Sequence, residues 1–380
     1  MILLLACTET ATTEPPADAR FALTAGAPGG SLLAWIDADA DAGDFPLVVS
    51  FDPGGSSLGS GSVRYDWSFG DGAGAVDAGE VVHTYVGEGS FVASLTLTDE
   101  VTGDVSVSEL TIEVSTPDCP DEGSPEDLGT LEDDEVDELS GIAVSRLDPT
   151  VYWVHEDGDE SDRLLAVDAE GAVLSEQGLP DEIDDLEDIS AVVDPQTGTP
   201  TLFLADTGDN DEERDNAAVW VVAEPDPWID GELVPLRMEL TYPDGPVDAE
   251  SLLVDPLTMD LYLLTKESDE ARVYVKRAPH DDEGPFEVEA LGTWSSLDFM
   301  ASGGDVSADG TRVVVRGYSS HARVWMRDGY LPLEAAFDED PCTVDIRSEE
   351  QGEGVAFTAD GAGLVTVSEG EDPSVSYVEL

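Results

Sequence analysis

The segment SGIAVS, residues 140–145, decides the fold, because four variants of it follow along the chain. Each copy is followed by a second apolar segment and then by a third, and four copies also have a candidate fourth. The copies begin about 50 residues apart, and three or four short strands at such a period are typical of a β-propeller. The copies are SGIAVS (140–145), EDISAV (187–192), ESLLVD (250–255), GDVSAD (304–309) and EGVAFT (353–358).

Five blades are visible in residues 138–380, and a divergent sixth stays open. The fifth copy reaches Leu380 without a fourth strand. Residues 117–137 form a linker rich in proline and acidic residues, in which we expect a strand around Leu128 to Leu131. That strand would complete the fifth blade and pair its open edge.

Residues 30–116 alternate apolar and polar side chains in short runs, most strictly at 91–97. This pattern predicts half-buried strands in an antiparallel sandwich. The segment YDWSFGDG (65–72), followed by HTYVGEGSFVASLTLTDE (83–100), resembles the PKD domain, an immunoglobulin-like β-sandwich of surface proteins. The resemblance implies that Trp67 fills the core, that residues 69–72 form a tight turn, and that the module serves spacing, adhesion or carbohydrate contact.

The predicted fold class is therefore all-β, with an N-terminal immunoglobulin-like β-sandwich plus a C-terminal β-propeller. The phrases SGIAVSRLDPTVYWVHEDGD (140–159), LEDIS (186–190), DTGDN (206–210) and YPDGPVDAESLLVD (242–255) carry a second resemblance. They are similar to exported bacterial propellers of a phytase-like, esterase-like kind. That resemblance covers about residues 138–380 and implies the fold much more firmly than a substrate.

The charge of the chain is extreme, with 86 Asp and Glu against 15 Lys and Arg and a net charge of −71. Such a surface repels nucleic-acid phosphates and anionic lipids, so the sequence excludes both as general partners. It favours divalent cations, cationic ligands or solubility in salty surroundings. We expect a monomer.

The first residues, MILLLACTET, resemble the end of a bacterial lipoprotein signal, with Leu4 to Cys7 as the lipobox. The match lacks a basic leader, and its apolar run is short. Residues 1–7 are a truncated signal with its lipobox, and we expect cleavage before Cys7, lipidation of the retained Cys7, and a flexible tether at 8–29. The predicted location is the bacterial outer membrane or cell surface, with secretion as the alternative, and membrane contact only through the lipid.

Two further cysteines, Cys119 and Cys342, remain. Disulfides persist in exported proteins, so a bridge between them is one interpretation, and two buried free thiols are the other.

Alignment of the five copies brings acidic residues into columns. The start of a blade's first strand and the end of its second lie at the same edge of an antiparallel sheet, so these columns face one end of the ring. Calcium takes six to eight oxygen ligands in flexible geometry and suits such a site. The residues predicted to bind it are Glu187, Asp188, Asp206, Asp209, Asn210, Glu250, Asp305 and Glu353.

Structural alternatives stay open for these residues. Asp209 and Asn210 are ordinary turn residues that tolerate left-handed backbone. The recurring acids could instead accept hydrogen bonds from backbone at the junction with the next blade.

Three functions fit these patterns. The first is a surface protein whose propeller binds calcium and a ligand, which could be a small molecule, a glycan or another surface protein. The second is a calcium-dependent hydrolase of the phosphoesterase or lactonase kind, with Lys266 and Arg316 holding anionic oxygens and Glu187, Glu250 or His155 as base. The third is a structural surface protein without a site. The sequence favours binding, because it nominates no clear general base.

Overall fold

A computed structural model describes residues 31–380, with gaps at 60–61, 132–135, 137–138, 158–162, 215–216, 268–270, 295–296, 298, 350 and 371–372. Cys7 and the predicted tether at 8–29 lie outside the described residues, so the lipidation of Cys7 stays a prediction. The regular secondary structure of the described residues is β-strand except for one 3-10 helix, η1 (Leu333–Asp338). No described helix has the length and apolar character needed to cross a membrane.

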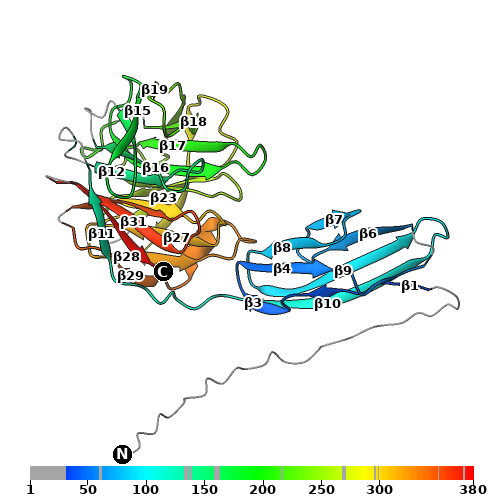
Figure 1. Cartoon of the computed structure of the whole chain (residues 1–380). Coiled ribbons are helices and arrows are strands. Elements are labelled where there is room, and N and C mark those ends of the chain that lie inside the picture. Colours follow the sequence, from blue (N-terminus) through cyan, green and yellow to red (C-terminus); the bar gives the residue numbers. More distant parts are fainter. Residues whose placement is uncertain are drawn as a thin grey trace, which may run out of the picture. The chain divides into compact units, whose positions relative to one another are not determined.

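The chain forms two compact units, one around residues 48–83 and 90–113 and the other containing residues 114–380. The first is a β-sandwich, coloured blue to cyan in Figure 1. Its larger sheet has the order β3-β10-β9-β6-β7, and its smaller sheet has the order β2-β4-β8, beside a short β1-β5 pair. The strands are β1 (Leu32–Leu33), β2 (Asp37–Ala38), β3 (Ala42–Asp44), β4 (Leu47–Asp52), β5 (Ser57–Leu58), β6 (Val63–Ser68), β7 (Gly74–Val76), β8 (Val81–Tyr85), β9 (Gly89–Asp99) and β10 (Val105–Ser115).

The predicted core and turn of the sandwich are present. Trp67 is 4% exposed and its indole nitrogen donates a hydrogen bond to the carbonyl of Ala78. After β6 the chain reverses at Phe69, whose amide donates to the carbonyl of Ala73. Gly70 adopts φ +92°, and a Cβ there would lie 2.6 Å from the backbone nitrogen of Val92, so only glycine fits this turn.

The second unit contains five antiparallel sheets of four main strands, coloured green to red in Figure 1. In each sheet the apolar segments recognised in the sequence form the first three strands, and their side chains are mostly buried. Blade 1 is β12 (Leu139–Val144), β13 (Tyr152–Glu156), β14 (Arg163–Val167) and β15 (Val173–Gly178), with β19 (Gly231–Glu232) added; blade 2 is β16 (Leu186–Val193), β17 (Pro200–Asp206), β18 (Ala218–Ala223) and β20 (Leu236–Thr241), with β24 (Phe286–Glu287) added. Blade 3 is β21 (Ala249–Val254), β22 (Leu261–Thr265), β23 (Ala271–Lys276) and β25 (Glu289–Trp294); blade 4 is β26 (Gly303–Val306), β27 (Arg312–Arg316), β28 (His321–Met326) and β29 (Cys342–Asp345); blade 5 is β30 (Gly352–Phe357), β31 (Gly363–Ser368), β32 (Ser374–Glu379) and β11 (Glu126–Thr130).

The first strands of the blades close a ring. β12 contacts β16, β16 contacts β21, β21 contacts β26, β26 contacts β30, and β30 contacts β12. The strand predicted near Leu128 is β11, which pairs antiparallel with β32 and completes blade 5. The described residues thus form a five-bladed β-propeller, without a sixth blade, and the predicted all-β fold class is confirmed.

Large side chains fill the space between blades. Trp153 of blade 1 packs with Leu186 and Ile189 of blade 2, and Tyr262 of blade 3 packs with Val313 of blade 4. Since apolar burial contributes about 25 cal/mol per Å², these junctions hold the ring together.

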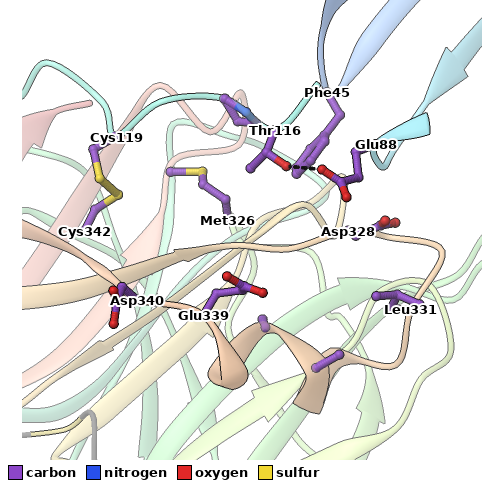
Figure 2. A pocket seen from close by; sticks show the side chains of 13 residues that line it. Phe45, Glu88, Thr116, Cys119, Met326, Asp328, Leu331, Glu339, Asp340 and Cys342 are labelled. Carbon is purple, nitrogen blue, oxygen red and sulfur yellow. Dashed lines mark hydrogen bonds between the residues drawn. A yellow bond between two sulfur atoms is a disulfide. The ribbon is translucent and has the colours of Figure 1, made fainter. Parts of the chain in front are cut away.

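Cys119 and Cys342 form a disulfide, with a Cα–Cα distance of 5.6 Å, visible at the left of Figure 2. Cys119 lies shortly before β11, and Cys342 begins β29 in blade 4. The bridge therefore fastens the segment that leads into the closing strand to the neighbouring blade.

Candidate metal centre

A β-bulge recurs in the first strand of four blades. The pairing register between first and second strand shifts at the same place in β12, β16, β21 and β30, whereas β26 pairs without a shift. A bulge inserts an unpaired residue and changes the direction of its side chain. The residues at the shifts are Ser140, Glu187, Glu250 and the pair Glu353–Gly354. We call the end of the ring where these bulges lie the mouth.

Five carboxylates gather at the mouth in two overlapping groups. One oxygen each from Asp157, Asp185 and Glu187 lie within 4.8 Å of one another. The same holds for Glu187, Asp248 and Glu250. Glu187 belongs to both groups, so blades 1, 2 and 3 converge on it. Glu187 and Glu250 are buried, and the three aspartates are half-buried.

The position of Asp206 corrects one column of the sequence alignment. Asp206 pairs with Leu186 at the end of β17, as Glu156 pairs with Leu139 and Thr265 with Ala249. The sequence alignment put Glu156, Asp206 and Lys266 in one column, but the residues equivalent to Lys266 are Asp157 and Thr207, one place later. Side chains alternate between the two faces of a strand, so Asp206 points to the face opposite to that of the Lys266 position.

The carboxylate of Asp206 is fully engaged by protein. It accepts hydrogen bonds from Arg214 at 2.6 Å, from the indole of Trp220 at 3.1 Å, and from the backbone amide of Asp185 at 3.0 Å. Asp206 is 1% exposed and belongs to neither carboxylate group. It anchors the loop that carries Asp185, which is a structural role.

Asp209 and Asn210 form the turn that was the alternative interpretation of DTGDN. The carboxylate of Asp209 accepts hydrogen bonds from the amides of Glu213 and Arg214, at 2.9 and 2.8 Å. Its own amide donates to Asp248 at 2.9 Å, while Asn210 is exposed. Asp209 thus orients Asp248, which does belong to the carboxylate groups.

Asp188 and Asp305 serve the blade junctions. Asp188 is fully buried and accepts hydrogen bonds from the amides of Leu252 in blade 3 and Gly304 in blade 4. Asp305 accepts one from Phe357 in blade 5. The sequence analysis considered such backbone hydrogen bonds for the recurring glutamates. In the structure it is the next residue, the aspartate, that accepts them.

The basic residues named in the sequence lie in different surroundings. The ammonium of Lys266 lies 2.6 Å from Glu250 and 5.4 Å from the ring centre of Tyr318, at the mouth. Arg316 is completely buried, pairs with Glu349 at 3.0 Å and donates to the carbonyl of Gly354. It fastens blade 4 to blade 5 and does not join the cluster around Glu187.

His155 is also buried, and its Nδ1 lies 2.9 Å from the carbonyl oxygen of Glu156. Burial lowers the pKa of His155 to about 4, so the imidazole is neutral at physiological pH.

The mouth holds more carboxylates than positive charges, and burial together with their mutual repulsion raises the pKa values of these acids. Burial, followed by the nearby Glu250, holds the pKa of Glu187 well above its ordinary value. Burial raises the pKa of Glu250 to about 7, although Lys266 opposes the shift. The pKa of Glu353 rises to about 9 and that of Asp185 to about 6, in both cases mainly through burial. One ammonium does not offset so many carboxylates, so a cation bound there would relieve their repulsion.

Three residues of this cluster, Asp157, Asp185 and Asp248, were missed in the sequence analysis. A signal for two of them exists. Asp185-Leu186-Glu187 and Asp248-Ala249-Glu250 place the same D-x-E pattern at the same point of two repeats. Asp157 would have followed from the corrected column.

Comparison with known proteins identifies the first unit. Residues 36–114 match the family model of the PKD domain, so this part of the chain is a PKD domain, as predicted. No curated protein matches the sequence.

Two solved structures are similar at a distance. A luciferin-regenerating enzyme is 12% identical with a TM-score of 0.38, over 78% of this chain and 92% of its own. An auxiliary nutrient binding protein from Bacteroides thetaiotaomicron is 8% identical with a TM-score of 0.37, over 91% of this chain and 97% of its own.

Proposed function

We propose that this is an exported surface protein, anchored by lipid at Cys7, whose propeller binds calcium and a ligand at the mouth. The PKD domain acts as the spacer or adhesion module. The ligand is a small molecule, a glycan or another surface protein. The PKD domain supports this location, because such domains occur in extracellular proteins. The disulfide supports it too, since disulfides persist in oxidising compartments.

One observation carries the calcium proposal. Glu187 belongs to both groups of carboxylates, which together bring acidic side chains from three blades around it. Hard oxygen ligands, carboxylates among them, are those that calcium prefers. The proposed ligands are Asp157, Asp185, Glu187, Asp248 and Glu250. Four of the acids predicted from the sequence accept hydrogen bonds from backbone amides or from Arg214, so we assign them a supporting role: Asp188, Asp206, Asp209 and Asp305.

Calorimetric titration of the full chain with calcium tests this proposal. High salt is needed, because it screens loose association with a surface of charge −71. We expect saturable binding of one ion, weakened at least tenfold in Glu187→Gln. The matched control is Glu289→Gln, which removes an exposed carboxylate from β25. Absence of saturable heat, or equal affinity in Glu187→Gln and the control, would reject the metal centre.

A calcium-dependent hydrolase is the second candidate, favoured by one observation. The pKa of Glu250 rises to about 7, where a carboxylate is an effective general base at neutral pH. The test is turnover of phosphate esters and lactones with calcium, and with Glu250→Gln as the inactive variant. Activity that survives Glu250→Gln would exclude Glu250 as the base.

A further inference from the structure

Glu250 stands between two parts of the mouth. On one side its oxygens approach Glu187 and Asp248, in the group to which we assign calcium. On the other side its carboxylate forms an ion pair with the ammonium of Lys266, at 2.6 Å. The carboxylate of Glu250 is 3% exposed and that of Glu187 is buried as well, whereas the Lys266 side chain is 23% exposed.

Glu353 lies on the Lys266 side. It is 3% exposed, and its Oε2 has no hydrogen-bond partner among the described residues. Its charge interacts with Glu250, Glu369, Lys266 and Arg316. Arg316 pairs with Glu349 through Nη1, while its Nη2 has no hydrogen-bond partner among the described residues, so both Lys266 and Arg316 supply positive charge near Glu353. A buried carboxylate oxygen without a partner is costly and marks a place where a ligand atom is expected.

The repeat pattern shows what Lys266 replaces. The equivalent position in blade 1 is Asp157, a member of the first carboxylate group, and in blade 5 it is Glu369. Blade 3 thus supplies a cation at a position where blades 1 and 5 supply acids. Glu250 and Glu353 occupy the equivalent bulge positions of blades 3 and 5, on the two sides of blade 4, and the charge of Lys266 acts on both.

We propose that the mouth contains a second cation site, between Glu250 and Glu353, which the ammonium of Lys266 fills in place of a metal ion. Lys266 therefore limits the propeller to one divalent cation and determines the stoichiometry of the site. The second site, once vacated, takes a divalent cation with oxygen ligands or a small alkylammonium ion. This inference rests on the proposed calcium centre, but it predicts a different measurement.

The test compares calcium stoichiometry in the full-length wild type and in Lys266→Met, again in high salt. We expect one ion in the wild type and two in Lys266→Met. Adding Glu353→Gln to Lys266→Met should remove the second ion and leave the first. The chain provides a matched control, because Lys276 is its only other lysine and lies on the outer side of the same blade, near Phe286. Lys276→Met removes the same charge and should still bind one ion.

A second probe makes the test independent of calcium. In Lys266→Ala, methylammonium should bind saturably and lower the affinity for the second calcium ion at least tenfold, whereas it should not bind the wild type. Lys266→Gln, which keeps the length of the side chain, replaces Lys266→Met if that variant does not fold.

The outcomes separate the two proposals. One ion in both wild type and Lys266→Met, with no methylammonium binding, would overturn the second site and leave the calcium centre. No ion in the wild type but one in Lys266→Met would overturn the calcium centre and support the second site. Equal gains in Lys266→Met and Lys276→Met would show an effect of net charge, which also overturns the second site.

Discussion

Individual carboxylates of this propeller differ in role according to what already occupies their oxygens. Asp206 is held by Arg214 and Trp220, whereas Glu187 meets mainly other acids. Residue type alone therefore does not separate a ligand from an anchor. The repeats indicated which segments carry acids, but the side to which each points depends on the exact pairing register. An error of one residue put Glu156 in the place of Asp157 and Asp206 in the place of Thr207.

Replacement of Asp206 tests this distinction at the residue scale. Asp206→Ala leaves Arg214 and the Asp185 amide without their acceptor, so we expect the free energy of unfolding to fall by about 3 kcal/mol. Urea unfolding of the variant measures this loss. Asp211→Ala, an exposed neighbour, should change stability little. Calcium affinity of the folded Asp206→Ala protein should fall less than in Glu187→Gln, because only the loop of Asp185 loses its anchor; unchanged stability with abolished binding would make Asp206 a ligand.

At the scale of elements, the bulged first strand is the feature that builds the mouth. The sequence predicted the strands well, because alternating and continuous apolar runs determine which segments pair and which are buried. It could not predict the bulges, since a register shift depends on the packing of the blade against its neighbours. In blades 2 and 3 the D-x-E pattern coincides with the bulge, and it is the sequence feature that could have indicated it.

The pairing of β12 with β13 gives a prediction at this scale. Beside the bulge, Gly141 pairs with His155, and a Cβ on Gly141 would lie 2.1 Å from His155 Nε2. Because His155 is buried and cannot retreat into solvent, Gly141→Ala should destabilise the propeller by about 1–3 kcal/mol. Thermal unfolding measures the change. Gly79→Ala, whose Cβ would meet no atom within 4 Å, is the control and should be neutral.

The disulfide gives a second prediction at this scale. It closes a loop of large sequence separation, 223 residues, and thereby restricts the unfolded chain. Cys119→Ser with Cys342→Ser should lower propeller stability by about 2–4 kcal/mol. Chemical unfolding with and without a reductant measures it. Reductant should affect wild type and leave the double variant unchanged; an effect on both would point to another cause.

At the scale of the whole molecule, excess negative charge is the main liability. The pKa values of Asp185, Glu250 and Glu353 rise to about 6, 7 and 9, so the folded state holds protons that the unfolded chain has released. Their contribution to stability is complete below the ordinary carboxyl pKa and is lost as pH rises through the raised values. Deprotonation thus strains the mouth over about pH 5 to 9.

We therefore expect the midpoint of thermal unfolding in EGTA to fall between pH 5 and pH 9, and calcium to raise it more at pH 9 than at pH 5. Calcium replaces the protons as the counter-charge, so its affinity rises with pH. Scanning calorimetry at several pH values measures both effects. In Glu353→Gln the decline in EGTA should be shallower; a slope that does not depend on Glu353 or calcium would assign it to the general surface charge.

The closure of blade 5 has a consequence for biogenesis. β11 leads into the propeller, yet its partner β32 belongs to the last segment of the ring to be synthesised. The ring therefore cannot be completed on the ribosome while the intervening blades are being translated. Until β32 arrives, blade 5 keeps an open edge and the ring stays incomplete. Assembly of the mouth, which needs all five first strands in place, is therefore a late step that follows synthesis of the last blade.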